Sequence, residues 1–285
     1  SPKGTAFGEA GETPAGIKAT VSSTIGILYL NGTANLKVSG FIFEGCAAPF
    51  TSSCWQLPIP AFIGGHHPRK CVIEDCEMRN TAGHGIQLVK PVNCAVRRCH
   101  IHHVGSCCID YIDGGDASEI LDCHVHHNGL FALAASAIGM QISNSKCIGN
   151  HIHHTPGCGV VMWSGFSLFA SNHLHHTMTS IRDGGGVYGA MNYCVFKDNY
   201  VHDSGDWPGL YNDEGGQHTV YTGNRFENCW WPIHMHDCRN ITVAENVFVN
   251  DGSFRFSFQG STHCTFKDNL IKTTMPITED GYVDA

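Results

Sequence analysis

The sequence predicts an all-β chain that folds as a right-handed parallel β-helix of about ten coils, each of 22–27 residues. A short segment of alternating apolar residues recurs along the chain, and its period in the twenties is typical of a solenoid. The period-2 alternation and the β-branched and aromatic content indicate strands rather than helices. We therefore expect a single β-helix domain over residues 1–285.

Each recurring segment, such as "CAVRRCHIHH" or "CVFKDNYVHD", surrounds one small polar position. Successive positions lie 23, 24, 27, 22, 27, 25, 22 and 23 residues apart. We expect them to form an inward ladder at a tight bend, with stacked Asn amides bonded along the axis and Cys as small buried fillers. The positions are Cys76, Cys99, Cys123, Asn150, Asn172, Asn199, Asn224, Asn246 and Asn269.

Histidine pairs follow the ladder in four coils, three and four residues after the small polar position. Because the pairs recur in coil after coil, they indicate scaffold rather than a local site, and no metal is expected. The pairs are His102/His103, His126/His127, His153/His154 and His175/His176.

The segment "CAAPFTSSCWQLPIPAFIGG" interrupts the repeat and predicts a loop insertion at 46–65. Its Cys46 and Cys54 are the expected disulfide. The chain starts in a loop-like Gly/Pro/Thr stretch without signal-peptide features, so we expect a part of a longer chain with flanking domains or protein partners. Acceptor patterns for N-glycosylation at Asn31 and Asn240 favour a secreted or extracellular protein.

Composition excludes two kinds of partner. The net charge is −8 and only 15% of residues are charged, so a nucleic-acid partner is not expected. No apolar stretch reaches the roughly 18–20 residues that span a bilayer, so membrane insertion is not expected.

A second short strand in each coil, for example "GGVYG" or "PGLYN", breaks the repeat on its outward side. If Val187, Leu210 and Ile233 point inward, neighbouring coils bring aromatic, histidine and carboxylate side chains together on one face. Rings stack on sugars and paired carboxylates cleave glycosidic bonds, so this face predicts carbohydrate chemistry, although Asp and Glu beside Gly also simply form turns. The cluster is Trp163, Tyr188, Tyr211, Asp213, His234 and His236, flanked by Arg182, Asp183 and Glu214.

The order "DGGGVY", "NYVHD", "GLYNDEGG" and "PIHMHD" resembles the parallel β-helix glycoside hydrolases, especially their fucosidase- and xylosidase-like branches, over residues 180–250. The resemblance implies Asp183 and Asp213 as the catalytic pair, with Glu214 replacing the family's second adjacent Asp. It also implies that Tyr188, Tyr211, His234 and His236 line the substrate subsite. Asn212 departs from the family, which has an apolar residue there.

The repeat offers a second carboxylate pair. Val187 and Leu210 are 23 residues apart, so Asp183 aligns with Asp206 at the same turn position of adjacent coils. Stacked carboxylates about 5 Å apart suit a retaining glycosidase, whereas Asp183 and Asp213, at opposite ends of a strand, suit inversion better.

Two other functions remain open beside a cofactor-free hydrolase. A polysaccharide lyase would need a base and a group that neutralises the uronate. Arg182, Tyr188, Tyr211 and His234 offer such groups, and Asp213 with Glu214 offers a Ca²⁺ site. A non-catalytic β-helical segment of an extracellular protein, structural or glycan-binding, is the other alternative.

Overall fold

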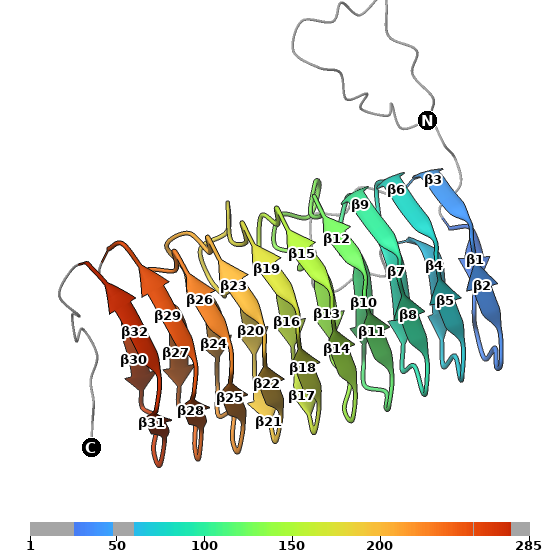
Figure 1. The fold of residues 1–285 in the computed structure, drawn as a ribbon. Coiled ribbons are helices and arrows are strands. Elements are labelled where there is room, and N and C mark those ends of the chain that lie inside the picture. The colour runs from blue at the N-terminus through green and yellow to red at the C-terminus, as the bar shows by residue number, and fades with distance from the viewer. Residues whose placement is uncertain (1–25, 48–59, 253, 275–285) are drawn as a thin grey trace, which may run out of the picture.

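The computed structural model describes residues 26–47, 60–252 and 254–274, and within these ranges it contains strands and no α-helix. The strands form a parallel β-helix, in which successive coils stack side by side along one axis (Figure 1). The predicted fold class and the number of coils are confirmed, since each of three sheets has ten strands. Among these residues there is no helix with the length and apolar character needed to cross a membrane.

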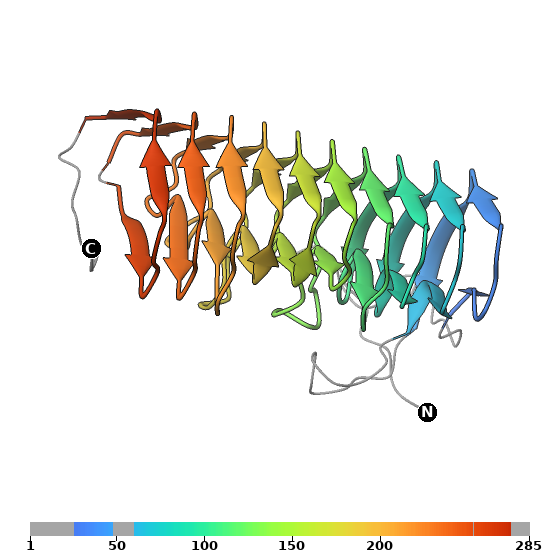
Figure 2. The same cartoon turned by 90° about the horizontal axis from the view of Figure 1, so that it is seen from below.

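Each coil visits three sheets in turn, and Figure 2 shows the same row of coils from below. The first sheet consists of β1 (Leu28–Tyr29), β4 (Ala61–His66), β7 (His84–Val89), β10 (Ile109–Ile112), β13 (Ile138–Met140), β16 (Val160–Met162), β20 (Val187–Gly189), β24 (Leu210–Asn212), β27 (Ile233–His236) and β30 (Phe256–Gln259). The second consists of β2 (Lys37–Ser39), β5 (Val72–Glu74), β8 (Ala95–Arg97), β11 (Glu119–Leu121), β14 (Lys146–Ile148), β18 (Leu168–Ala170), β22 (Val195–Lys197), β25 (Val220–Thr222), β28 (Thr242–Ala244) and β31 (Thr265–Lys267). The third consists of β3 (Ile42–Cys46), β6 (Glu77–Thr81), β9 (His100–Val104), β12 (His124–His126), β15 (His151–His153), β19 (His173–His175), β23 (Tyr200–His202), β26 (Arg225–Glu227), β29 (Val247–Asn250) and β32 (Leu270–Thr273). A small extra pair joins β17 (Ser164–Gly165) and β21 (Met191–Asn192).

The predicted ladder lies at the bend between the second and third sheets. Asn172 Nδ2 donates to Asn199 Oδ1 at 3.1 Å, and Asn199 Nδ2 donates to Asn224 Oδ1 at 2.8 Å. The same oxygens accept backbone N–H groups, because Asn172 N lies 2.9 Å from Asn199 Oδ1. The residue before each ladder position has a positive φ, for example 52° at Asp122 and 71° at Gly149, which turns the chain sharply enough to aim the next side chain inward.

At the other end of the second sheet, the bend from the first sheet carries a hydroxyl ladder that the sequence analysis missed. Cys94 N donates to Ser118 Oγ at 3.1 Å, Ser118 N to Ser145 Oγ at 3.2 Å, and Ser145 N to Ser167 Oγ at 3.1 Å. These side chains are short and varied in type, so the column is not visible as one recurring letter.

The predicted loop insertion at 46–65 is too long at both ends. Cys46 is the last residue of β3, and residues 61–65 belong to β4, where Ala61 pairs with His84 of β7. Ala61, Phe62 and Ile63 are buried, and their contact with the core holds this segment in the first sheet. Cys54 lies outside the described residues, so its disulfide with Cys46 stays a prediction.

Candidate functional site

The predicted ring cluster forms on the first sheet, across β16, β20, β24 and β27. Tyr188 pairs with Tyr211 and Tyr211 pairs with His234, in strict register. The ring centroids of Tyr188 and Tyr211 are 5.1 Å apart, and those of Tyr211 and His234 are 4.3 Å apart. Trp163, which directly follows β16, is 38% exposed and meets the Tyr188 ring edge-on at 6.1 Å. These side chains line one continuous aromatic strip.

Asp213, directly after β24, is the best-connected carboxylate of this strip. It accepts hydrogen bonds from the Tyr188 hydroxyl at 3.1 Å, from His236 Nδ1 at 2.7 Å and from the Glu214 backbone N–H at 2.9 Å. Its side chain is only 7% exposed, whereas the sequence analysis placed it on an open face. The side chains of Tyr188 and His236 fold over it from the two neighbouring strands and restrict its access to solvent.

The other predicted carboxylates are exposed and lie in connections. Asp183 comes before β20 and Asp206 before β24, and these two strands are paired, while the stacking of Asp183 with Asp206 stays a prediction. Arg182 and Glu214 are also exposed, on either side of the strip. Burial is the main cause that raises the pKa of Tyr188 and Tyr211, and the negative charges of Asp213 and then Asp183 add to it.

Two groups at the strip were missed by the sequence analysis. Trp231, in the connection before β27, has its ring 4.5 Å from the His234 ring. The guanidinium carbon of Arg255, from the next coil, lies 4.0 Å above the Trp231 ring. The doublet "WW" just before "PIHMHD" was the available signal for Trp231, but Arg255 lies in a different coil and outside the quoted motifs.

Three buried nitrogen atoms beside the strip have no hydrogen-bond partner among the described residues: His234 Nδ1, Trp231 Nε1 and Arg255 Nε. Six further buried side-chain atoms of the described residues are unpaired as well, so these nitrogens do not by themselves mark a ligand site.

Burial and charge set the protonation of the strip. Burial, the charge of His236 and the charge of Arg255 lower the pKa of His234 to about 4, so this imidazole is neutral at pH 7. Burial, followed by the negative charge of Asp213, raises the pKa of both Tyr188 and Tyr211, so their hydroxyls keep their protons. The strip therefore offers neutral hydroxyl and imidazole groups around one carboxylate.

Asn212, the departure from the resembling family, has a structural role. Its side chain is buried, and its Oδ1 accepts the backbone N–H of Met191 at 3.0 Å. The interruption between β20 and β21, where Gly189 has φ 141°, is held by this contact. An apolar residue at 212 would leave the Met191 N–H without that acceptor.

A second polar cluster lies on the first sheet several coils away. Gln87 Nε2 donates to Asp110 Oδ2 at 3.1 Å and lies 3.2 Å from His84 Nε2, while His84 Nδ1 accepts the Cys107 backbone N–H at 3.2 Å. Burial raises the pKa of Asp110 to about 6 and lowers that of His84 to about 4.

The hollow of about 460 Å³ lies elsewhere, against the second sheet. It is lined by Phe166, Tyr193, Lys146 and Lys197, among others, and includes none of the predicted catalytic residues. A shallow hollow without carboxylates offers binding at most, so the Asp213 strip remains the candidate for chemistry.

The family model for the right-handed β-helix region matches residues 18–147 and 136–278. No curated protein matches the chain in sequence. Among solved structures, DFA-IIIase from Arthrobacter chlorophenolicus A6 is 14% identical, with a TM-score of 0.58, covering 90% of this chain and 77% of that one. The A-module of the Azotobacter vinelandii mannuronan C-5 epimerase AlgE4 is 12% identical, with a TM-score of 0.54, covering 90% of this chain and 83% of that one.

The Dettilon tailspike protein is 11% identical, with a TM-score of 0.51, and the match covers 88% of this chain. The chain spans 60% of the tailspike chain and 55% of DFA-IIIase as solved in complex with DFA-III. At such identities the likeness concerns the fold, and one fold serves many activities. The family model covers most of the sequence, and the chain belongs to the right-handed β-helix family.

Proposed function

We propose that this chain is a carbohydrate-active enzyme that hydrolyses glycosidic bonds at the Asp213 strip. The observation that carries the proposal is the buried carboxylate of Asp213, held by Tyr188 and His236 within a strip of rings. A carboxylate fixed by donors from two neighbouring strands is preorganised to meet the positive charge of an oxocarbenium-like transition state.

The rings support sugar binding. Trp163 and the two tyrosines present apolar faces of the size of a pyranose, and the exposed Trp163 ring is available to the outermost sugar. The row of rings beside the Asp213 carboxylate distinguishes the strip from a surface of turns.

Hydrolysis needs a second carboxyl group as proton donor. Asp183 is the preferred partner because the family resemblance implies it and because it precedes β20, the strand that carries Tyr188. Glu214, adjacent in sequence, and Asp206, aligned with Asp183, are the alternatives. The exposed group protonates the leaving oxygen, while Asp213 acts as base or nucleophile.

One observation favours a second candidate, a lyase-type reaction on a uronate polymer. Tyr188 and His236 flank one carboxylate, as a general base and acid would, and Arg255 offers a positive charge for the uronate. No calcium ion is required in this version, because Arg255 replaces it.

The test is a panel of neutral and uronate polysaccharides incubated with the parent chain. New reducing ends without new unsaturation identify hydrolysis, whereas ultraviolet absorbance of unsaturated uronate identifies a lyase. Asp213→Asn should lower turnover at least about 100-fold in either case. Asp198→Asn is the matched control, since Asp198 is exposed at a bend remote from the strip.

Variants of the other carboxylates identify the second catalytic carboxyl group. Loss of activity in Asp183→Asn and Asp213→Asn but not in Asp206→Asn supports the Asp183 and Asp213 pair, whereas loss in Asp183→Asn and Asp206→Asn with an active Asp213→Asn assigns the stacked pair. If Trp163→Ala weakens glycan binding but no polysaccharide is cleaved by the parent, the chain is a glycan-binding segment. If the parent neither binds nor cleaves any glycan, the proposal is wrong and a structural segment replaces it.

A further inference from the structure

The third sheet carries three parallel columns of imidazole rings, far more extensive than the histidine pairs seen in the sequence. The strands β9, β12, β15, β19 and β23 pair in strict register, so histidines at equivalent positions stack. The left column is His100, His124, His151 and His173; the central column is His102, His126, His153, His175 and His202; the right column is His103, His127, His154 and His176. We call these residues the histidine ladder.

Rings within each column lie face to face. The centroids of His100 and His124 are 4.7 Å apart, and those of His126 and His153 are also 4.7 Å apart, with interplanar angles of 4° and 5°. This spacing matches the separation of neighbouring strands, so stacking alone explains the columns. It does not explain the contacts between columns.

Between columns, ring nitrogens point directly at each other. His126 Nε2 lies 2.9 Å from His100 Nε2, and His126 Nδ1 lies 2.6 Å from His127 Nδ1. The same two contacts recur around His153 and around His175, at 2.6–2.9 Å. In each contact one ring must donate a proton and the other must accept it, so every central ring bonds on both sides.

Carboxylates terminate this pattern at both ends of the ladder. Glu77 takes the left position before His100, and its Oε1 lies 3.5 Å from His102 Nε2. Asp203 takes the right position after His176, and its Oδ2 lies 2.7 Å from His202 Nδ1. Every ring of the central column therefore has an imidazole or a carboxylate on each side, and both groups can bind metal ions.

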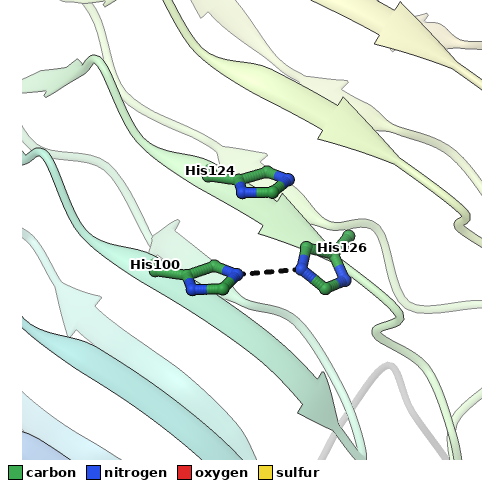
Figure 3. Close-up of side chains that lie close together, drawn as sticks. All are labelled: His100, His124 and His126. Atoms are coloured by element: carbon green, nitrogen blue, oxygen red, sulfur yellow. Dashed lines mark hydrogen bonds between the residues drawn. The ribbon is translucent and has the colours of Figure 1, made fainter.

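Several sets of three side chains bring their ligand atoms within 4.8 Å of one another, among them His100, His124 and His126 (Figure 3). A second set, His151, His173 and His175, shares no residue with the first. Three imidazoles around one point, with a fourth position left for water, are a common zinc arrangement with Zn–N distances of about 2.0–2.1 Å. Tetrahedral ligands at that distance lie roughly 3.3 Å apart, so the facing nitrogens of His100 and His126, 2.9 Å apart, separate by a few tenths of an ångström. The His124 ring, stacked on His100 with centroids 4.7 Å apart, tilts towards the same point to become the third ligand.

We propose that the histidine ladder binds divalent transition-metal ions of the zinc, copper, nickel and cobalt class, with at least two ions per chain. Imidazole suits these borderline ions, whereas Mg²⁺ and Ca²⁺ require oxygen ligands that the ladder lacks between its ends. The metal takes the place of the proton between two facing nitrogens, and that proton moves to the other nitrogen of its ring or is released to solvent.

The experiment measures Zn²⁺ and Mg²⁺ binding by calorimetry at neutral pH, on the whole chain produced without a polyhistidine tag. The ladder variant His102→Gln/His126→Gln/His153→Gln/His175→Gln removes a ligand from both of these sets and from the sets that overlap the ladder: His124/His151/His153, His126/His127/His153 and Glu77/His100/His102. The control His218→Gln/His263→Gln removes two exposed histidines outside the ladder. We expect at least two Zn²⁺ ions per chain in the parent and the control. In the ladder variant we expect affinity to fall by more than the about 10–100-fold that accompanies loss of an outer partner of a metal ligand.

Co²⁺ provides a readout that does not depend on the variants folding. Tetrahedral coordination by imidazoles gives Co²⁺ an intense visible absorption, and zinc added afterwards should abolish it. The proposal is overturned if the parent binds Zn²⁺ no better than Mg²⁺, if Co²⁺ keeps its weak aqueous spectrum, or if the folded ladder variant binds Zn²⁺ as tightly as the control. The histidine ladder would then be a stacking scaffold only.

Discussion

The asparagine ladder can be tested most sharply at Asn199. Its side chain is 3% exposed and takes part in four hydrogen bonds. Its Nδ2 donates to Phe169 O at 3.1 Å and to Asn224 Oδ1 at 2.8 Å. Its Oδ1 accepts from the backbone and side-chain nitrogens of Asn172. Asn199→Leu has a similar volume but removes all four bonds.

The expected decrease in the free energy of unfolding depends on which partner groups lose their hydrogen bonds. Asn172 Nδ2 still donates to Cys147 O, and Asn224 Oδ1 still accepts the backbone N–H of residue 199. The Asn172 backbone N–H loses the Asn199 Oδ1 acceptor, and a buried group left without a hydrogen bond costs about 1–3 kcal/mol. Adding about 1 kcal/mol for each of two further net bonds lost gives a decrease of about 3–5 kcal/mol in the free energy of unfolding.

Urea unfolding followed by circular dichroism measures the change, and amide hydrogen exchange at Asn172 locates it. Asn31→Leu is the control, because Asn31 is exposed, its φ is not positive and its side chain accepts the exposed His66 N–H at 2.9 Å. Asn199→Cys should fall between the two, since Cys occupies the equivalent position in three other coils. If Asn199→Leu unfolds at the same urea concentration as Asn31→Leu, or if the Asn172 amide stays equally protected, the asparagine ladder does not stabilise the coil.

Three further predictions concern pH and the strip. Burial lowers the pKa of His126 to about 2 and of His153 to about 3, so below about pH 6.5 the unfolded chain takes up protons at these rings and the folded chain does not. The free energy of unfolding should therefore fall by about 1 kcal/mol per ring between about pH 6.5 and about pH 5 after solvent screening. The urea midpoint of the histidine-ladder variant should vary less with pH than that of the parent. Burial raises the pKa of Asp110 to about 6, so the favourable contribution of its protonated form to the free energy of unfolding is lost as the pH rises through about 6. Asp110→Asn should therefore stabilise the chain by about 2 kcal/mol at about pH 8 but not at about pH 4. An equal change in the free energy of unfolding at both pH values would contradict a cost of burying the charged carboxylate. Tyr188→Phe removes one of three donors to Asp213 and should lower kcat about tenfold with little change in KM or in thermal midpoint, whereas unchanged kcat would exclude the hydroxyl from the reaction.

The candidate site was predicted in part from the sequence. The inward positions Val187, Leu210 and Ile233 set the register of three neighbouring strands. Counting one residue onward from each position was enough to predict that Tyr188, Tyr211 and His234 lie side by side. Counting residues per coil predicts contacts between equivalent positions of paired strands. It does not predict contacts that long side chains make between connections, which is why Trp231 and Arg255 were missed.

The sequence by itself determined the fold and the axis of the molecule, because a solenoid repeats one local pattern and each coil pairs only with its neighbours. It determined that Asn199 lies above Asn172 and that His126 lies above His102. Only the tertiary structure decided how side chains meet across a strand. The Nε2 contact between His100 and His126 and the burial of Asp213 under Tyr188 and His236 depend on rotamers and on the twist between coils, which the repeat does not encode.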